Sequence, residues 1–388
     1  MAAVIALLMS GAAAAQPRPF SPVRQRDGWL TFKLRGVEPS QLRAAYLRIH
    51  RHRYGLGLRR VRAGARGGRL HLRLPRAARR RARQIPNHRV KARLVLTLGS
   101  SSAPSPRATF PIRAGFYYPW FPQTWKVGGD YTHFHPSLGY YDTDDPAVQR
   151  AHVRALDYAG MDAAISEWKP PPSYLDSRLH ALLAQTVAIR SPLKWAIYYA
   201  PEGKSDPAPG AIAADLAYVR DKLATSPAFL KVNGRFVVFV WSSGPTDASC
   251  SLADRWNAAD QQIGNAAYVV LKVFSGYRGC GSQPDGWHQY GPAVSTSSVP
   301  GFSYTVSPGF WKANEATPRL ERDLGRFKQD IRDMVASGAP WQLVTTFNEW
   351  GEGTAVESSS EWQTRSGEGA YLDSLHRMLG GRRLSESR

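Results

Sequence analysis

The sequence predicts an α/β fold: a (β/α)8 TIM barrel preceded by a small all-β sandwich-like module. The chain has 388 residues, enough for a barrel of about 250 residues and one further module. From residue 108 onward, short apolar segments alternate with stretches of helical periodicity, a pattern typical of parallel β/α units. Residues 17–107 instead contain short, closely spaced strand patterns with no helical stretch between them.

Residues 1–16, MAAVIALLMSGAAAAQ, are an apolar stretch followed by small residues. Ala13 and Ala15 form an A-x-A-like cleavage site before Gln16, although the charged n-region of a signal peptide is missing. The pattern predicts a signal-peptide remnant and a secreted protein, extracellular or associated with the cell surface. The stretch is too short to span a bilayer and no later apolar stretch reaches the length of a spanning helix, so no transmembrane segment is expected.

Residues 17–107 are predicted to form the all-β module. A Ser/Pro-rich linker, SSSAPSPR over residues 100–107, ends the module and sets the boundary to a barrel expected over residues 108–388. The segments that alternate or run apolar, with Gly or Pro around them, are GWLTFKL, AAYLRIHRH, RLHLRLP and VKARLVLTLG.

The formal net charge of +21 is concentrated near the N-terminus. Residues 17–113 hold 25 Lys and Arg against Asp27 and Glu38, a net charge of +23, so the rest of the chain carries −2. Two interpretations remain open: contact with an anionic partner, which is nucleic acid, anionic lipid or an acidic surface polymer, or solvated surface charge without a partner. The Arg-rich stretch RAARRRARQ (76–84) has no interleaved aromatic residues, which argues against specific nucleic-acid binding.

The sequence indicates neither a metal site nor a cofactor. Cys250 and Cys280, the only cysteines, lack metal-ligand spacing and are compatible with one disulfide in an exported protein. His133 and His135 form an H-x-H pair, but no acid or third histidine lies beside them at helical spacing. There is no Walker pattern, and no G-x-G-x-x-G follows a predicted strand.

Eight segments are predicted to form the barrel strands, and helical stretches lie between most of them. The connection between the fifth and sixth segments is short and poorly helical, so the count is softest at positions five to seven. The predicted strands are 113–120, 162–168, 194–200, 235–241, 267–274, 286–293, 302–309 and 342–350.

Two of the intervening helices carry clear end signals. In the first, over 142–160, Asp144 or Asp145 is expected as the cap, Pro146 fits the first turn and Gly160 stops the helix. The second is predicted over 317–338. It has Pro318 near its start, Gly338 at its end and an apolar stripe formed by Leu320, Leu324, Phe327, Ile331 and Met334.

The C-terminal ends of the predicted strands are rich in aromatic and acidic residues. TIM barrels place their chemistry at this face, and flat rings with polar edges suit sugar binding. The alternative is that each aromatic side chain belongs to the core and that Glu167 forms a barrel salt bridge. The residues expected to line a substrate pocket are Tyr117, Tyr118, Trp120, Glu167, Trp168, Tyr199, Trp241, His288, Tyr290 and Trp350.

Two glutamates, Glu349 and Glu352, follow the last predicted strand. Cleavage of a glycosidic bond needs one carboxylic acid that stays protonated and a second carboxylate. Burial and a nearby like charge both raise a carboxyl pKa, and an aromatic neighbour such as Trp350 favours burial. We therefore interpret Glu349 and Glu352 as a catalytic pair rather than as a solvated acidic loop. Glycines 351 and 353 allow the tight turn that holds them.

The motif FNEWGEGT (347–354) closely resembles the signature of glycoside hydrolase family 99, the endo-α-mannosidases and endo-α-mannanases. The segments GFYYPWF (115–121), HFHPSLGYYDTDDP (133–146) and HVRALDYAGMDAAISEW (152–168) resemble the opening segments of that family, in the same order. The resemblance covers roughly residues 113–378, the whole barrel. Gly351 departs from well-studied members, which often carry a histidine at that place.

The resemblance implies a retaining reaction through a 1,2-anhydro sugar. Glu349 is implied as the base for the 2-hydroxyl and Glu352 as the acid for the leaving oxygen, later the base for water. Asn348 is implied to orient a glutamate or a sugar hydroxyl, and His135 to shape a loop or touch sugar. The implied substrate is an oligosaccharide or polysaccharide with α-mannoside-type linkages, and no metal is implied.

Two rival functions stay open. One is a carbohydrate-binding or polysaccharide-assembly protein that uses the same cleft without hydrolysis, since relatives with a similar motif occur in polysaccharide-synthesis clusters. The other is a surface-interaction protein in which the Arg-rich segment is the functional part.

Overall fold

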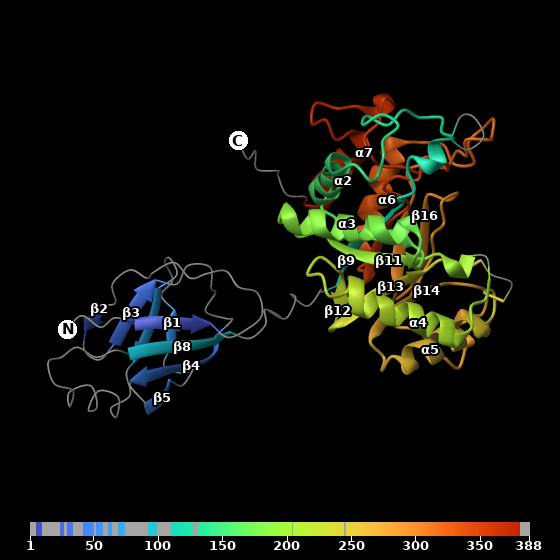
Figure 1. Cartoon of the computed structure of the whole chain (residues 1–388). Helices are drawn as coiled ribbons and strands as arrows, with labels where there is room; N and C mark the ends of the chain where they lie inside the picture. The colour runs from blue at the N-terminus through green and yellow to red at the C-terminus, as the bar shows by residue number, and fades with distance from the viewer. Residues whose placement is uncertain are drawn as a thin grey trace. The chain divides into compact units, whose positions relative to one another are not determined.

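The computed structural model describes residues 110–126, 131–203, 205–243 and 246–380, together with the backbone of the N-terminal strands. The chain divides into two compact units, Met1–Pro106 and Arg107–Arg388 (Figure 1). Each unit is described by itself below.

The first unit contains two four-stranded sheets. One has the order β1 (Ile5–Met9), β8 (Ala92–Leu98), β4 (Leu42–Ile49) and β5 (His52–Leu56); the other has β2 (Arg24–Arg26), β3 (Trp29–Lys33), β7 (Arg69–Arg73) and β6 (Val61–Ala63). Strand β1 pairs in parallel with β8. It lies inside residues 1–16, and the signal-peptide prediction for that segment stays a prediction.

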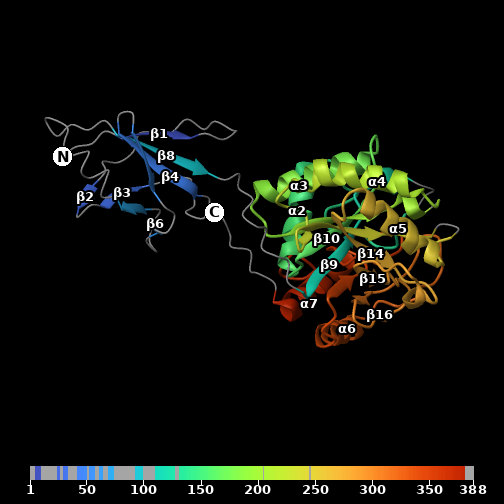
Figure 2. The ribbon, with the colours of Figure 1, turned by 90° about the horizontal axis from the view of Figure 1, so that it is seen from below.

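The second unit is built around one sheet of mostly parallel strands, and its ring is nearly closed (Figure 2). Neighbouring strands are parallel from β15 round to β17, while β12 (Lys231–Val232) and β16 (Thr296–Val299) pair antiparallel at the periphery. The eight parallel strands in sheet order are β15 (Gly286–His288), β14 (Ala267–Lys272), β13 (Arg235–Val240), β11 (Lys194–Tyr199), β10 (Ala163–Trp168), β9 (Ile112–Tyr117), β18 (Trp341–Val344) and β17 (Ser303–Val306).

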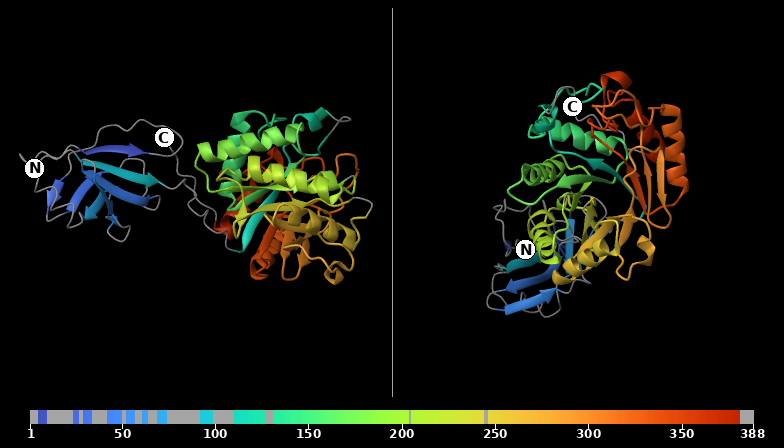
Figure 3. Two further views of the ribbon diagram at one scale, coloured as in Figure 1. Left: turned by 60° about the horizontal axis from the view of Figure 1, so that its bottom comes forward. Right: turned by 90° about the vertical axis from the view of Figure 1, so that its right-hand side faces the viewer.

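These eight strands fall inside or within a residue of the predicted segments, so the predicted TIM barrel is confirmed for this unit. Helices cover the outside of the sheet, with α2 beside α3, α4 beside α5 and α6 beside α7 (Figure 3). Their bounds are α2 (Pro146–Tyr158), α3 (Tyr174–Ala188), α4 (Pro209–Tyr218), α5 (Cys250–Gln262), α6 (Leu324–Ala336) and α7 (Ala370–Leu379). As expected, β14 and β15 are joined without an α-helix, by the short 3-10 helix η7 (Tyr277–Gly279).

The predicted end signals of α2 are confirmed. The Asp145 side chain accepts a hydrogen bond from the backbone N–H of Ala147, Pro146 is the first helical residue, and Gly160 follows the helix with a φ of 80°. This glycine adopts a backbone conformation that other residues rarely reach.

The predicted start of α6 was wrong by seven residues. The helix begins at Leu324, where the Asp323 side chain caps the backbone N–H of Arg326. Leu320 instead forms an antiparallel bridge with Phe310. A capping carboxylate directly before the apolar stripe is a stronger start signal than Pro318, because it satisfies an N–H that the helix leaves unpaired.

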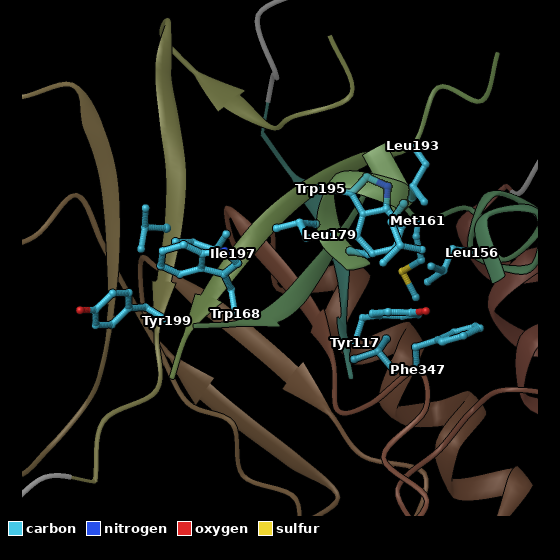
Figure 4. Close-up of a cluster of buried hydrophobic side chains, with 14 of the residues drawn as sticks. Tyr117, Leu156, Met161, Trp168, Leu179, Leu193, Trp195, Ile197, Tyr199 and Phe347 are labelled. Atoms are coloured by element: carbon cyan, nitrogen blue, oxygen red, sulfur yellow. The ribbon is translucent and has the colours of Figure 1, made fainter. Parts of the chain in front are cut away.

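Two buried layers follow from the alternation of side chains along each strand. Alternate residues such as Ala114, Phe116 and Tyr118 of the β9 segment pack inside the barrel, while their neighbours pack between the sheet and the helices. Figure 4 shows part of this outer layer, with Tyr117, Trp168 and Tyr199 among the labelled side chains. This alternation decides which strand-end residues can reach a cavity at the mouth of the barrel.

Cys250 and Cys280 form a disulfide that links the start of α5 to the end of η7. The sequence was compatible with one disulfide, and the structure shows that the two cysteines form it. Among the described residues, no helix combines the length and the apolar character that crossing a bilayer requires.

Candidate active site

The segment after β18 folds back on itself and carries both glutamates. The backbone N–H of Glu349 donates to the Thr346 hydroxyl (2.8 Å), and the N–H of Thr354 donates to the carbonyl of Glu349 (3.2 Å). Gly353 has a φ of 63°, and a β-carbon there would lie 2.6 Å from the carbonyl oxygen of Trp311. A side chain at this position is therefore excluded by both strain and contact.

Gly351 leaves room for a neighbouring side chain. A β-carbon at this residue would lie 2.7 Å from the ring of Tyr131. The Tyr131 hydroxyl donates a hydrogen bond to Oε1 of Glu349 (3.0 Å). The absence of a side chain at 351 thus lets a tyrosine reach the first glutamate.

The two glutamates line the same cavity, which has a volume of about 400 Å³. Oε2 of Glu349 accepts a hydrogen bond from the backbone N–H of Glu352 (2.6 Å), and Oε2 of Glu352 accepts one from the Tyr290 hydroxyl (3.4 Å). Glu349 is only 4% exposed, and Glu352 is half-buried. The cavity is of the size that takes a small ligand or part of a larger one.

We call this space the aromatic cavity, because six aromatic side chains line it. The rings of Tyr118 and Trp120 stack with centroids 4.4 Å apart, and the Tyr118 hydroxyl donates to that of Tyr290 (2.9 Å). The residues that line it are Tyr118, Trp120, Tyr131, Glu167, Tyr198, Trp241, Tyr290, Lys312, Ala313, Asn314, Glu349, Gly351 and Glu352. Both predicted catalytic residues and five of the predicted substrate-binding residues are therefore brought together here.

Three predicted substrate-binding residues point away from the aromatic cavity. Tyr117, Trp168 and Tyr199 belong to the outer layer between the sheet and the helices (Figure 4). The Tyr117 hydroxyl bonds to His152 (2.9 Å), the Trp168 indole N–H to Asp176 (2.8 Å) and the Tyr199 hydroxyl to Asp215 (2.7 Å). Each is one residue away in its strand from an inward position, and this corrects the prediction that they contact substrate.

Asn348 and Trp350 are fully buried behind the cavity wall rather than in it. The Asn348 amide accepts from the backbone N–H of Tyr118 (2.8 Å) and donates to its carbonyl (2.9 Å). The Trp350 indole N–H donates to Glu357 (3.1 Å). These two residues hold the wall and the turn in place, so the prediction that they bind substrate directly is corrected.

The two remaining histidine candidates are also absent from the cavity lining. His135 is exposed and pairs with Glu361, with Nδ1 2.6 Å from Oε1. His288 is fully buried below the cavity among the rings of Phe116, Tyr198 and Phe239, where burial lowers its pKa to about 3. His288 is therefore a neutral residue of the barrel interior.

Four polar residues of the cavity were missed by the sequence analysis as binding residues: Tyr131, Tyr198, Lys312 and Asn314. Tyr198 could have been predicted from the strand pattern. It lies opposite Glu167 in the register of β10 and β11, and both residues line the cavity. Tyr131, Lys312 and Asn314 come from loops, where no periodicity indicates the direction of a side chain.

The loop that carries Lys312 is bound to the loop of the glutamates. The backbone N–H groups of Trp311 and Ala313 donate to the carbonyls of Glu352 (2.8 Å) and Gly351 (2.9 Å). His133 stacks on Trp311 (3.8 Å between centroids) and its Nε2 lies 2.9 Å from the Lys312 carbonyl. Donation to that carbonyl makes His133 a residue that supports the loop.

The electrostatics of the site keep a proton on the glutamate pair. Burial, and then the negative charge of Glu352, raise the pKa of Glu349 to about 8. Burial also raises the pKa of Glu352, although the Lys312 charge and the Tyr290 hydrogen bond act in the opposite direction. Two interacting carboxyl groups titrate as a pair. The proton that this pair retains to the higher pH is held mainly by Glu349.

Among the described residues, one acidic group has a spacing that would suit a metal ion: Glu202, Asp206 and Asp247. The Arg255 guanidinium lies in its middle, paired with Glu202 and at 3.0 Å from Asp247 and 3.5 Å from Asp206. Arginine therefore supplies the positive charge that this group needs. None of these residues lines the aromatic cavity.

The fold and the site together define a TIM barrel with one buried and one half-buried glutamate in an aromatic cavity, at the C-terminal ends of its strands. No family model matches the chain, and no curated protein matches it. Solved structures do match in fold.

A GH99 endo-alpha-mannosidase from Bacteroides thetaiotaomicron is 20% identical, with a TM-score of 0.53 over 69% of this chain and 95% of that chain. A second structure of that enzyme, in complex with BIS-TRIS-propane, gives a TM-score of 0.55 at 20% identity over 70% and 96%. A glycoside hydrolase-like protein is 16% identical, with a TM-score of 0.51 over 71% and 94%. The resemblance to glycoside hydrolase family 99 is thus confirmed at the level of the fold.

The raised pKa of Glu349 predicts a specific dependence of stability on pH. The folded chain holds a proton at Glu349 up to about pH 8, whereas the ordinary value is 4.5, so stability is lost as the pH rises between these values. Wild type should therefore lose stability between pH 5 and pH 9, whereas Glu349→Gln should not. The free energy of unfolding of the variant, relative to that of wild type, should rise by about 2–4 kcal/mol over this range. Urea denaturation at several pH values measures this.

The matched control is Glu321→Gln, which changes an exposed glutamate on the same unit. Its stability should follow wild type at every pH. Parallel curves for Glu349→Gln and wild type would show that Glu349 holds no such proton.

Proposed function

We propose that the chain is a retaining glycoside hydrolase that cleaves α-mannoside-type linkages in a glycan. The observation that carries the proposal is the placement of Glu349 and Glu352 in one aromatic cavity, where burial raises the pKa of both carboxyls. Glycoside cleavage needs a carboxylic acid that stays protonated near neutral pH together with a second carboxyl group. The fold shared with endo-α-mannosidase structures supports the same class of substrate.

In the proposed reaction, Glu349 removes the proton of the sugar 2-hydroxyl, and that oxygen attacks C1. Glu352 gives its proton to the leaving glycosidic oxygen as the C1–oxygen bond breaks, which leaves a 1,2-anhydro sugar. Glu352 then takes a proton from water as the water oxygen attacks C1. This attack opens the three-membered ring of the 1,2-anhydro sugar. Glu349 returns its proton to O2, so the sugar regains its hydroxyl with net retention.

These roles require the shared proton to be on Glu352 when the reaction starts, whereas the site without ligand favours it on Glu349. Substrate binding therefore has to move one proton from Glu349 to Glu352 before the bond breaks. Both side chains line the same cavity, where a sugar hydroxyl of the substrate can relay the proton.

Hydrolysis of α-mannan oligosaccharides by the full chain, followed by mass spectrometry of the products, tests the proposal. Wild type should release shorter glycans, and Glu349→Gln and Glu352→Gln should each lower kcat by about 1,000-fold or more, because each removes a group that acts in the transition state. Glu361→Gln, a glutamate outside the cavity, is the control and should retain activity.

Other outcomes distinguish the rival functions. Glycan binding without any product favours a carbohydrate-binding or polysaccharide-assembly protein. Activity in both Gln variants would place the chemistry elsewhere in the chain.

We further propose that the protein is secreted and that its Arg-rich segment contacts an anionic polymer at the cell surface. The leader-like residues 1–16 and the Cys250–Cys280 disulfide support export, because disulfides persist in oxidising compartments. The +23 charge over residues 17–113 supports the polymer contact.

Retention of the full chain on dextran sulfate, compared with neutral dextran, tests the polymer contact. Substituting Arg79, Arg80, Arg81 and Arg83 by Gln should weaken retention and reduce its dependence on salt, since fewer charges are screened. The control set, in which four exposed barrel arginines are changed to Gln, should elute as wild type: Arg154, Arg332, Arg365 and Arg377. Equal retention of wild type, the segment variant and the barrel control would contradict the polymer contact. The Arg-rich segment would then be solvated charge without a partner.

A further inference from the structure

A third carboxylate, Glu357, is buried behind the turn that carries the catalytic pair. It is only 3% exposed and is absent from the lining of the aromatic cavity. Its Oε2 accepts hydrogen bonds from the Tyr141 hydroxyl (2.8 Å) and the Trp350 indole N–H (3.1 Å), and its Oε1 from Nε2 of His152 (3.1 Å). Three different donors therefore converge on one side chain.

The network extends one step further on each side. Nε2 of His152 faces Glu357, and on the other edge of the ring the Tyr117 hydroxyl lies 2.9 Å from Nδ1. On the other side, the Tyr141 hydroxyl accepts from the Asn348 amide and from the Trp350 indole, each at 3.3 Å. We call these six residues the Glu357 network.

The Glu357 network holds both neighbours of the catalytic Glu349. Asn348 precedes it and Trp350 follows it, and the backbone N–H of Glu357 itself donates to the carbonyl of Phe347 (2.9 Å). Asn348 also bonds both backbone groups of Tyr118, which forms the cavity wall. The segment that carries Glu349 is thus attached to Glu357 at three positions around the catalytic residue.

Stability alone gives a weak reason for this arrangement. Burying a carboxylate costs free energy, and apolar residues of similar volume often stabilise a core as well or better. A carboxylate fixes directions, however, because each oxygen accepts along defined lines. Placement of reacting groups matters steeply in catalysis, where an error of about 1 Å costs about 100-fold in rate.

We propose that Glu357 is a positioning residue for the glutamate pair: it holds Trp350 directly and Asn348 through Tyr141, and so fixes the direction in which Glu349 enters the aromatic cavity. This inference rests on the proposed function, in which Glu349 must meet the 2-hydroxyl of the sugar. His152 and Tyr117 hold Glu357 from the other side.

The chain offers a closely matched control in Asp176. This carboxylate is 6% exposed, and it accepts from the Trp168 indole N–H (2.8 Å) and the Tyr218 hydroxyl (2.7 Å), with His180 at 3.7 Å. Its three partners are of the same types as those of Glu357. None of these four residues lines the cavity.

The test compares Glu357→Gln with Asp176→Asn in the full chain. An amide carries one acceptor oxygen and one donor NH₂, so the substituted side chain would face an indole, hydroxyl or imidazole donor with its own donor; both variants should therefore lose thermal stability. Glu357→Gln should lower kcat about 10- to 100-fold with KM changed less than about threefold, while Asp176→Asn keeps the wild-type kcat.

A double-mutant cycle with Tyr141→Phe adds a second criterion. Because both substitutions remove the same attachment of Asn348, the fall in kcat of the double variant should be clearly smaller than the product of the two single effects. A wild-type kcat in Glu357→Gln overturns the inference. So does a loss in Asp176→Asn as large as that in Glu357→Gln, since that would report general destabilisation.

The failure of the proposed function is recognised separately, because wild type itself would then cut no glycan. In that case a crystal structure of Glu357→Gln decides the inference. Loss of the contact between the Tyr131 hydroxyl and Glu349 supports positioning by Glu357. An unchanged contact overturns it.

Discussion

The structure depends on holding two carboxyl groups, Glu349 and Glu352, together in one cavity. Burial and mutual repulsion both penalise their charge, so the pair retains a proton that separate glutamates would lose. The surroundings offset part of this cost through directed hydrogen bonds from Tyr131, Tyr290 and the backbone of Glu352 itself. The same penalty that destabilises the fold provides an acid near neutral pH, the property that glycoside cleavage requires.

The elements around the pair follow from this requirement. Glycine at 351 admits the ring of Tyr131, and glycine at 353 allows the turn to close against Trp311. The loop of Lys312 is attached to the same turn by two backbone hydrogen bonds, which brings a positive charge near Glu352. The site is therefore assembled from three loops, and a parallel barrel brings the loops to one face.

Much of this arrangement could be predicted from the sequence. The eight strands have apolar, β-branched segments with clear boundaries, and the pair of glutamates follows the last of them at a glycine-rich turn. The direction of individual side chains was harder, because a shift of one residue moves a side chain to the opposite face. Tyr117, Trp168 and Tyr199 were assigned to the cavity for this reason, whereas Tyr198 was missed. The network around Glu357 joins residues more than 200 positions apart, and no local pattern indicates it.

The shared proton is tested most directly by ¹³C NMR titration of the side-chain carboxyl carbons of Glu349 and Glu352 in the full chain. One proton is expected to stay on the pair until about pH 8, and Glu352→Gln should lower the pKa of Glu349, since a repelling charge is removed. Two independent titrations near 4.5, each unaffected by loss of the other glutamate, would contradict a shared proton and leave the cavity without its acid.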